Sequence, residues 1–188
     1  MRFPLFETGV ETHAEGHAGW SPRGNPIHLM LKPPADLAER VARLDESQRS
    51  RPPEILHTLL QPVGDRSWIT DADIEATRRA LSRVRHAPFL MLFDRIEGGE
   101  TMALRGGIQN CAAQEFRLVV LDALFSHYER LPTYRLDPHM IVHDRGEGRP
   151  GRLLAQPIAW LVDEVVLVET MLGETRHVEL GRWRLTGD

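Results

Sequence analysis

Two short segments of the sequence carry histidines whose types and spacing suit acid–base chemistry. "HTLLQ" (57–61) and "HMIVH" (139–143) both have the composition of β-strands, and each begins with a histidine, His57 and His139. Because the pKa of a free imidazole is ~6.5, histidine can take up or release a proton at neutral pH. Two imidazoles that face each other across a cleft could therefore act as general base and general acid, for example on a phosphodiester.

Strand alternation predicts which polar side chains accompany these histidines. In a strand every second side chain points to the same face, so positions two and four after each histidine should share its face. The fourth position is Gln61 in one segment and His143 in the other. Each segment thus offers a histidine followed by a second hydrogen-bonding group on the same predicted face.

Other interpretations of these histidines stay open. A histidine on a strand often serves as a structural hydrogen-bonding residue. Zinc is another alternative, since histidine is a common zinc ligand. A zinc site would want three or four ligands, however, and the pattern supplies no obvious acidic partner on the same face. We therefore place acid–base chemistry ahead of a metal site and expect neither a metal nor a cofactor.

The hydrophobic patterning predicts the elements that must position the two histidines. In chain order it gives a strand (26–32), a helix (33–48), a strand (54–65), a helix (70–85), a hairpin (88–107), a helix (112–131), a strand (137–144) and a second hairpin (158–185) that turns near Gly173. Residues 144–152 read as a flexible loop. Thr70 or Asp71 is the expected N-cap of the second helix.

This order predicts an α+β protein of two pseudo-symmetric lobes. Hairpins favour antiparallel sheets, with helices packed outside and a cleft in the centre. A helix precedes the His57 strand, and another helix precedes the His139 strand, which suggests two related halves. Residues 1–24 show no hydrophobic period and are expected to form an irregular arm, with residues 25–188 as one bilobal domain.

Composition narrows the functional classes. The chain has 188 residues and a formal net charge of −4, which argues against a broad nucleic-acid-binding surface but not against a local cationic cleft. The single cysteine, Cys111, excludes an internal disulfide. No apolar run approaches the ~20 residues of a membrane helix, and the N-terminal segment has no signal-peptide pattern. We therefore expect a cytoplasmic protein without a membrane partner, and a monomer.

Three segments together resemble the 2H phosphoesterase superfamily, and specifically its bacterial RNA 2′,3′-cyclic phosphodiesterases, also called 2′-5′ RNA ligases. They are "PPEILHTLLQPVGD" (52–65), "DPHMIV" (137–142) and the C-terminal segment 157–185. The resemblance implies a metal-independent enzyme that hydrolyses 2′,3′-cyclic phosphates at RNA ends or on small nucleotides to 2′-phosphates. It also implies possible 2′-5′ RNA ligase activity, with His57 and His139 as the catalytic residues.

The sequence departs from that family two positions after each histidine. The family has Thr or Ser there, whose hydroxyl binds the phosphate, whereas this chain has Leu59 and Ile141. We hypothesise that Gln61 and His143, further along the same faces, supply the missing donors. Arg145 is a further candidate. Thr58 points away from the His57 face in a regular strand, and could bind phosphate if a bulge redirected it.

The departure keeps two other functions open. Loss of both hydroxyls could leave a non-catalytic module that binds RNA or nucleotides. The chain could also be a diverged 2H enzyme that acts on another substrate.

Overall fold

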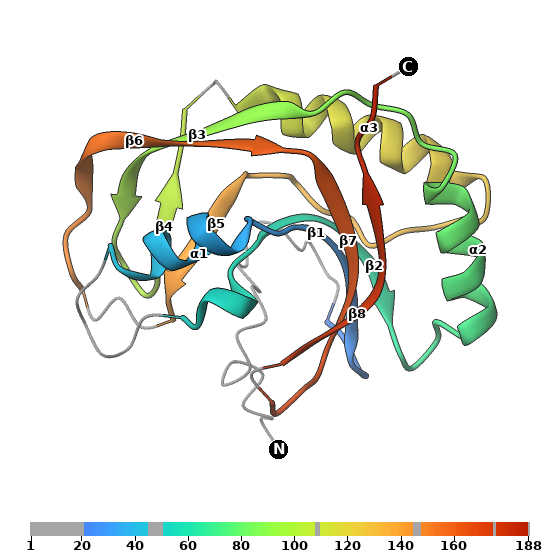
Figure 1. The fold of residues 1–188 in the computed structure, drawn as a ribbon. Coiled ribbons are helices and arrows are strands. Elements are labelled where there is room, and N and C mark those ends of the chain that lie inside the picture. Colours follow the sequence, from blue (N-terminus) through green and yellow to red (C-terminus); the bar gives the residue numbers. More distant parts are fainter. Residues whose placement is uncertain (1–20, 45–50, 108–109, 145–147, 175, 188) are drawn as a thin grey trace.

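The computed structural model describes residues 21–44, 51–107, 110–144, 148–174 and 176–187. Over these residues the chain forms two four-stranded antiparallel sheets with three α-helices (Figure 1). The α+β class and the two-sheet architecture predicted from the sequence are confirmed. The described part of the expected N-terminal arm, residues 21–24, contains no helix or strand, and residues 1–20 lie outside the described residues.

The first sheet has the strand order β2-β1-β7-β8, and the second has the order β5-β4-β3-β6. The strands are β1 (Pro26–Leu31), β2 (Thr58–Asp65), β3 (Phe89–Glu97), β4 (Met102–Arg105), β5 (His139–His143), β6 (Arg152–Val162), β7 (Glu164–Thr170) and β8 (His177–Arg184). The helices are α1 (Ala35–Ala42), α2 (Asp71–Leu81) and α3 (Cys111–Phe125), with a short 3₁₀ turn, η1, at Pro53–Ile55.

Both sheets contain the same strand–helix–strand unit around their histidine. In the first sheet β1 leads through α1 to β2, and β1 pairs with β2 antiparallel. In the second, β4 leads through α3 to β5, and β4 pairs with β5 antiparallel. β2 and β5 are each one of the two edge strands of their sheet. The repeat of helix and histidine strand seen in the sequence therefore corresponds to two related halves.

The predicted C-terminal hairpin is wrong in its first arm. Residues 158–162 belong to β6, which begins at Arg152 and pairs with β3 in the second sheet. The chain then crosses at Asp163 to the first sheet, where β7 and β8 form the hairpin. Gly173 in its turn has φ of +81°, a conformation that favours glycine. The apolar pattern continues across Asp163, so it gives no sign that the two halves join different sheets.

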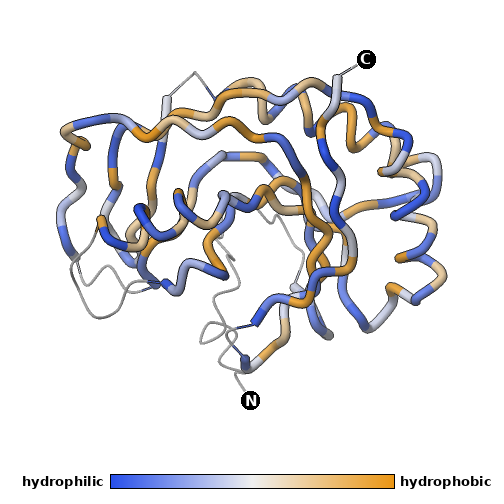
Figure 2. Tube along the Cα trace, viewed as in Figure 1, coloured by the Kyte–Doolittle hydropathy of each residue, from blue (hydrophilic) through white to orange (hydrophobic). Residues whose placement is uncertain are grey.

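A continuous hydrophobic core joins the two sheets and the helices. It contains Leu29 and Leu167 of the first sheet, Met91 and Leu104 of the second, and Phe116 of α3. Apolar stretches run along the strands of both sheets and along α3 (Figure 2). α3 contacts α2, β2 and β3, so it lies against strands of both sheets.

The buried face of α3 is narrower than the sequence predicts. Phe116, Val120 and Leu124 are buried, as expected, whereas Val119 is exposed and Ala123 is half-buried. Helical spacing alone widens the apolar stripe beyond the part that the sheets cover.

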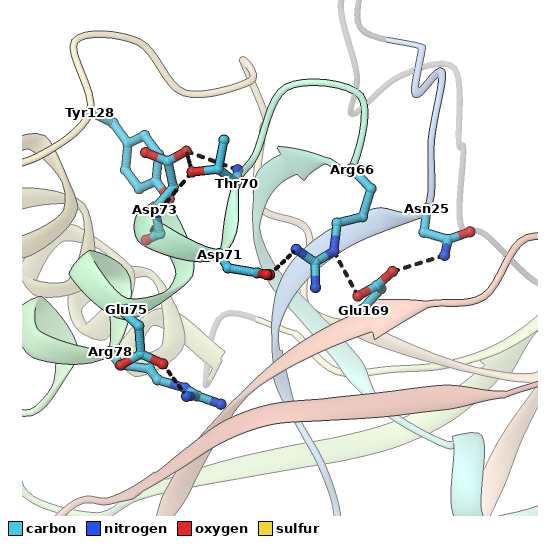
Figure 3. A network of polar contacts seen from close by, with 9 residues as sticks. All are labelled: Asn25, Arg66, Thr70, Asp71, Asp73, Glu75, Arg78, Tyr128 and Glu169. Carbon is cyan, nitrogen blue, oxygen red and sulfur yellow. Dashed lines mark hydrogen bonds and ion pairs between the residues drawn. The ribbon is translucent and has the colours of Figure 1, made fainter.

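Polar contacts tie α2 to the first sheet (Figure 3). The guanidinium of Arg66 donates to Glu169 of β7 at 2.9 Å and to Asp71 of α2 at 2.8 Å. Thr70 is the N-cap of α2: its hydroxyl accepts from the backbone N–H of Asp73, whose carboxylate accepts from the backbone N–H of Thr70. This capping box satisfies helix N–H groups that would otherwise lack partners.

Among the described residues, no helix is long and apolar enough to span a membrane.

Candidate active site

His57 lies between η1 and the first residue of β2 and is only 3% exposed. The Pro52–Pro53 pair starts η1, since proline suits the first position of a helical turn. This turn places the Ile55 carbonyl next to the imidazole, 2.7 Å from His57 Nδ1. A carbonyl can only accept a hydrogen bond, so Nδ1 carries the proton and Nε2 carries the lone pair of the neutral ring.

His139 is held in the same way at the start of β5. Its Nδ1 lies 2.6 Å from the carbonyl of Asp137, again two residues before the histidine, and the side chain is 6% exposed. On the neighbouring strand Arg105 is its partner in the β4–β5 register. In both histidines Nδ1 is bonded to a backbone carbonyl, so Nε2 is the nitrogen that a general base or acid would have to use.

The two histidine strands lie against each other, and their flanking segments are cross-linked. Arg51, six residues before His57, donates its backbone N–H to Val142, three residues after His139, at 2.9 Å. The side-chain amide of Gln61, four residues after His57, donates to the carbonyl of a proline seven residues before His139, at 3.1 Å. The two segments therefore run antiparallel, and both histidines lie in the interval between these two links.

Gln61 does not share the face of His57 as the sequence predicts. In the pairing of β1 with β2, Met30 is opposite Leu59 and Leu29 is opposite Gln61, so the register skips Leu60. Such a one-residue shift, as in a β-bulge, reverses the alternation of the strand beyond it. Since cross-strand partners share a face, Gln61 lies on the core side with Leu29.

The same shift occurs at the same position in β5. Ala103 is opposite Ile141 and Met102 is opposite His143, so the register skips Val142. His143 therefore lies on the side of Met102, which belongs to the hydrophobic core. The prediction that His139, Ile141 and His143 line one face is wrong for the last of them, because the alternation is interrupted between the second and the third.

The contacts of Gln61 connect the two halves. Its amide nitrogen donates to the carbonyls of Pro62 and Pro132, and its amide oxygen accepts from Arg117 of α3 at 2.9 Å. Arg117 in turn donates to the Tyr134 carbonyl at 2.8 Å. These bonds anchor the segment that leads into β5. Phosphate binding by Gln61 and by His143 stays a prediction.

The remaining phosphate-binding candidates differ in position. Thr58 is buried opposite Leu31 on the core side, and its hydroxyl has no hydrogen-bond partner among the described residues. Arg145 lies outside the described residues.

Leu59 and Ile141, at the positions where the family has hydroxyls, are 4% and 2% exposed. Their cross-strand partners, Met30 and Ala103, are apolar as well.

The structure adds a neighbour of His57 that spacing does not reveal. The ring of His177, at the start of β8, lies edge-on to the ring of His57 with 5.1 Å between their centroids. His28 and Arg51 are also close enough for their charges to act on His57. A single histidine after a hairpin turn carries no pattern in the sequence, so only the packing of distant segments could identify His177.

This environment keeps the imidazoles of His57 and His177 neutral at neutral pH. Burial, followed by the charges of His177 and Arg51, holds the pKa of His57 well below its usual 6.5, although the Ile55 carbonyl opposes the shift. Burial, with the charges of Lys32 and Arg51, lowers the pKa of His177 to about 4. The His57 ring is therefore neutral at neutral pH.

A cavity of about 470 Å³ lies beside α1 and η1, and His57, His139 and His177 are not among its lining residues. Lys32, whose charge acts on His177, lines it together with Pro33, Pro53, Glu164 and Arg182. Burial, followed by the charge of Arg182, lowers the pKa of Lys32. Within the described ranges, no group of three or more histidine, cysteine or acidic side chains is arranged to hold a metal ion.

Comparison of the sequence with models of known families and with curated proteins found no match. Solved structures do match. E. coli LigT, crystallised with 3′-AMP, is 18% identical and superposes with a TM-score of 0.70 over 86% of this chain and 98% of its own. A phosphoesterase crystal structure is 17% identical with a TM-score of 0.68, covering 86% of this chain and 99% of that one.

TT0787 of Thermus thermophilus is 21% identical, with a TM-score of 0.60 over 87% of this chain and 99% of that chain. These superpositions establish the fold, whereas identities of 17–21% leave activity to be argued from the site. The described chain therefore has the α+β fold of LigT. In this chain a histidine stands directly before β2 and another at the start of β5, and these two edge strands contact each other.

Proposed function

We propose that this chain is a metal-independent 2H phosphoesterase that hydrolyses 2′,3′-cyclic phosphates, at RNA ends or on small nucleotides, to 2′-phosphates. The observation that carries this proposal is the matched pair of imidazoles. His57 and His139 each bond through Nδ1 to the carbonyl two residues earlier, on edge strands that contact each other. Two equivalent imidazoles can divide the work of base and acid between them.

The electrostatics support His57 as the base. Its depressed pKa keeps Nε2 unprotonated, so it can take a proton from a water molecule as that water attacks phosphorus. His139 then acts as the acid. His139 enters this step as the imidazolium, with one proton on Nδ1 bonded to the Asp137 carbonyl and a second on Nε2. As the bond between phosphorus and the 3′-oxygen breaks, it gives the Nε2 proton to the departing oxygen. The product carries a 2′-phosphate and a free 3′-hydroxyl, and proton exchange with water restores both rings.

The nature of the substrate rests on the fold and on the complexes of a related structure. LigT has been crystallised with 3′-AMP, with ATP and with NADP⁺, so a protein of this fold binds nucleotides. Two cationic side chains, Arg51 and Lys32, act on the histidines here: Arg51 on His57 and His177, and Lys32 on His177. Their charges favour an anionic ligand in the same place. A 5′-hydroxyl that attacks the 2′,3′-cyclic phosphate in place of water, with the 3′-oxygen as the leaving group, would join RNA ends through a 2′-5′ bond.

Turnover of a nucleoside 2′,3′-cyclic phosphate tests this proposal. We expect the wild-type chain to yield the 2′-phosphate, with 2′ and 3′ products resolved by chromatography. His57→Ala and His139→Ala should each lower kcat by ~10²–10⁴-fold, the range expected for loss of general acid–base catalysis. His86→Ala, at a half-buried histidine outside the site, should remain active. Full activity in either catalytic-histidine variant would exclude the mechanism.

A non-catalytic nucleotide-binding module is the second candidate, and one observation favours it. Leu59 and Ile141 are buried among apolar partners where the 2H family has phosphate-binding hydroxyls. In that case the wild-type chain would bind the cyclic nucleotide in a calorimeter without converting it. A chain that neither binds nor converts it would point to a diverged enzyme with another phosphoester or acyl substrate.

A further inference from the structure

The side of the site next to His57 lacks the hydroxyl that the 2H pattern places there. Leu59 follows His57 on the same face, where its alkyl side chain cannot donate a hydrogen bond. The next polar residue along β2, Gln61, is turned to the core side and bonded to Pro132 and Arg117. A phosphate bound beside His57 therefore needs a donor from another element.

His177 lies next to His57 and carries an imidazole N–H group that can serve as this donor. Its ring is edge-on to that of His57, at 5.1 Å between centroids and 71° between planes. Its Nδ1 is buried and has no hydrogen-bond partner among the described residues. A buried imidazole nitrogen without a partner is energetically costly unless a ligand supplies one. The position is also cationic, since the charges of Lys32 and Arg51 both reach it.

We propose that His177 is a substrate-binding residue that replaces the absent hydroxyl, donating a hydrogen bond to a non-bridging oxygen of the phosphate held beside His57. This inference rests on the proposed function for the identity of the phosphoester. A neutral imidazole has one N–H donor, and the second ring nitrogen can accept from solvent. The donor therefore comes from β8, in the C-terminal hairpin, and not from the strand that carries His57.

Two substitutions separate hydrogen bonding from packing. H177F keeps an aromatic ring against His57 but cannot donate, whereas H177Q keeps an N–H donor and loses the ring. H127F provides a matched control, because His127 contacts Asp73 of α2, outside the site. We would measure kcat/KM for a nucleoside 2′,3′-cyclic phosphate and, separately, the affinity for the nucleoside 2′-phosphate. Thermal melts would verify that each variant is folded.

We expect H177F to lose about 10- to 100-fold in kcat/KM and in affinity, the usual effect of removing one hydrogen bond to a charged group. H177Q should stay within about threefold of wild type, by the same reasoning that the donor is kept, and H127F should be unaffected. Wild-type behaviour of H177F overturns the proposal, and so does an equal loss in H177Q and H177F.

The affinity measurement tests the role of His177 separately from the proposed hydrolytic function. If the wild-type chain binds the 2′-phosphate without turning over the cyclic substrate, the hydrolytic function fails, and a selective loss of affinity in H177F still supports the contact. If the wild-type chain turns over the substrate and H177F does so equally well, hydrolysis stands and the role of His177 is wrong. If the wild-type chain does not bind the nucleotide at all, both fail.

Discussion

Arg51, in the segment that leads into β2, forms an ion pair with Asp144 at the end of β5, with Nε 2.7 Å and Nη2 2.5 Å from Oδ1. The guanidinium is 3% exposed, whereas half of the Asp144 side chain is exposed. The backbone N–H of Arg51 also bonds to Val142. The segment that precedes β2 is thus bonded to the C-terminal end of β5, and these bonds hold the two sheets in a fixed relative position.

Asp144→Ala should destabilise the fold. The substitution leaves a buried guanidinium without this partner, and we expect the free energy of unfolding to fall by about 1–3 kcal/mol, less than for a fully buried pair because water reaches the aspartate. Urea denaturation provides the measurement. Glu39→Ala, which breaks a solvent-exposed pair with Arg43, should change the unfolding free energy by less than about 0.5 kcal/mol. Equal effects in the two variants would contradict the role of Arg51.

The rate of hydrolysis should stay high under mildly acidic conditions. A base works only in its unprotonated form, and burial together with the charges of His177 and Arg51 keeps the pKa of His57 well below 6.5. The acidic limb of the kcat/KM profile should therefore fall well below pH 6.5, and steady-state rates in a series of buffers would locate it. An acidic limb centred at pH 6.5 or above would argue against His57 as the base in the free enzyme.

Leu59→Thr should improve phosphate binding. Leu59 lies on the face of His57, so a hydroxyl there would stand where the 2H pattern has one. One added neutral hydrogen bond is worth ~0.5–1.5 kcal/mol, which corresponds to a roughly 2- to 10-fold gain in affinity for inorganic phosphate. Calorimetric titration would measure it.

Leu60→Thr is the matched control for this substitution. Leu60 belongs to the hydrophobic core, so the hydroxyl of a threonine at this position would be buried away from the site. We expect about 1–3 kcal/mol of lost stability and no gain in affinity. An equal gain in phosphate affinity in both variants would show that Leu59 and Leu60 do not lie on opposite faces of β2.

Gln61→Leu distinguishes a structural role from the predicted phosphate-binding role. The substitution removes the acceptor of Arg117 and the donor to Pro132, so we expect the unfolding free energy to drop by about 1–3 kcal/mol. Phosphate affinity of the folded protein should be unchanged. The opposite pattern, intact stability with weakened phosphate binding, would restore Gln61 as a ligand-binding residue despite the register shift.

Stability should decline as the pH falls from about 6.5 towards 4. The unfolded chain protonates its histidines near pH 6.5, whereas folded His177, with a pKa of about 4, stays neutral through this window. Because the unfolded state binds more protons there, the unfolding free energy rises with pH and is lost on acidification. H177Q should show a shallower slope between pH 6.5 and 5 in denaturation experiments. An unchanged slope would mean that folding does not lower the pKa of His177.

The features that depend on local pattern could be predicted from the amino-acid sequence. Hydrophobic period predicts the strand and helix types, and Thr70 is one of the two predicted N-caps of α2. The strand predicted over 54–65 begins only at Thr58, because Pro53–Ile55 form a 3₁₀ turn. The repeat of helix and histidine strand predicts the two related halves. Each of these is set by residues within a few positions of one another, so the chain alone encodes them.

The features that depend on a partner strand or on distant segments emerged only from the folded chain. The register shifts at Leu60 and Val142 exist only against β1 and β4, and they turn Gln61 and His143 away from the faces that regular alternation assigns. The contact between His177 and His57 joins residues that no spacing relates. Burial and neighbouring charges then set the pKa of His57, because solvation and charge distance are properties of the packed molecule and not of the chain.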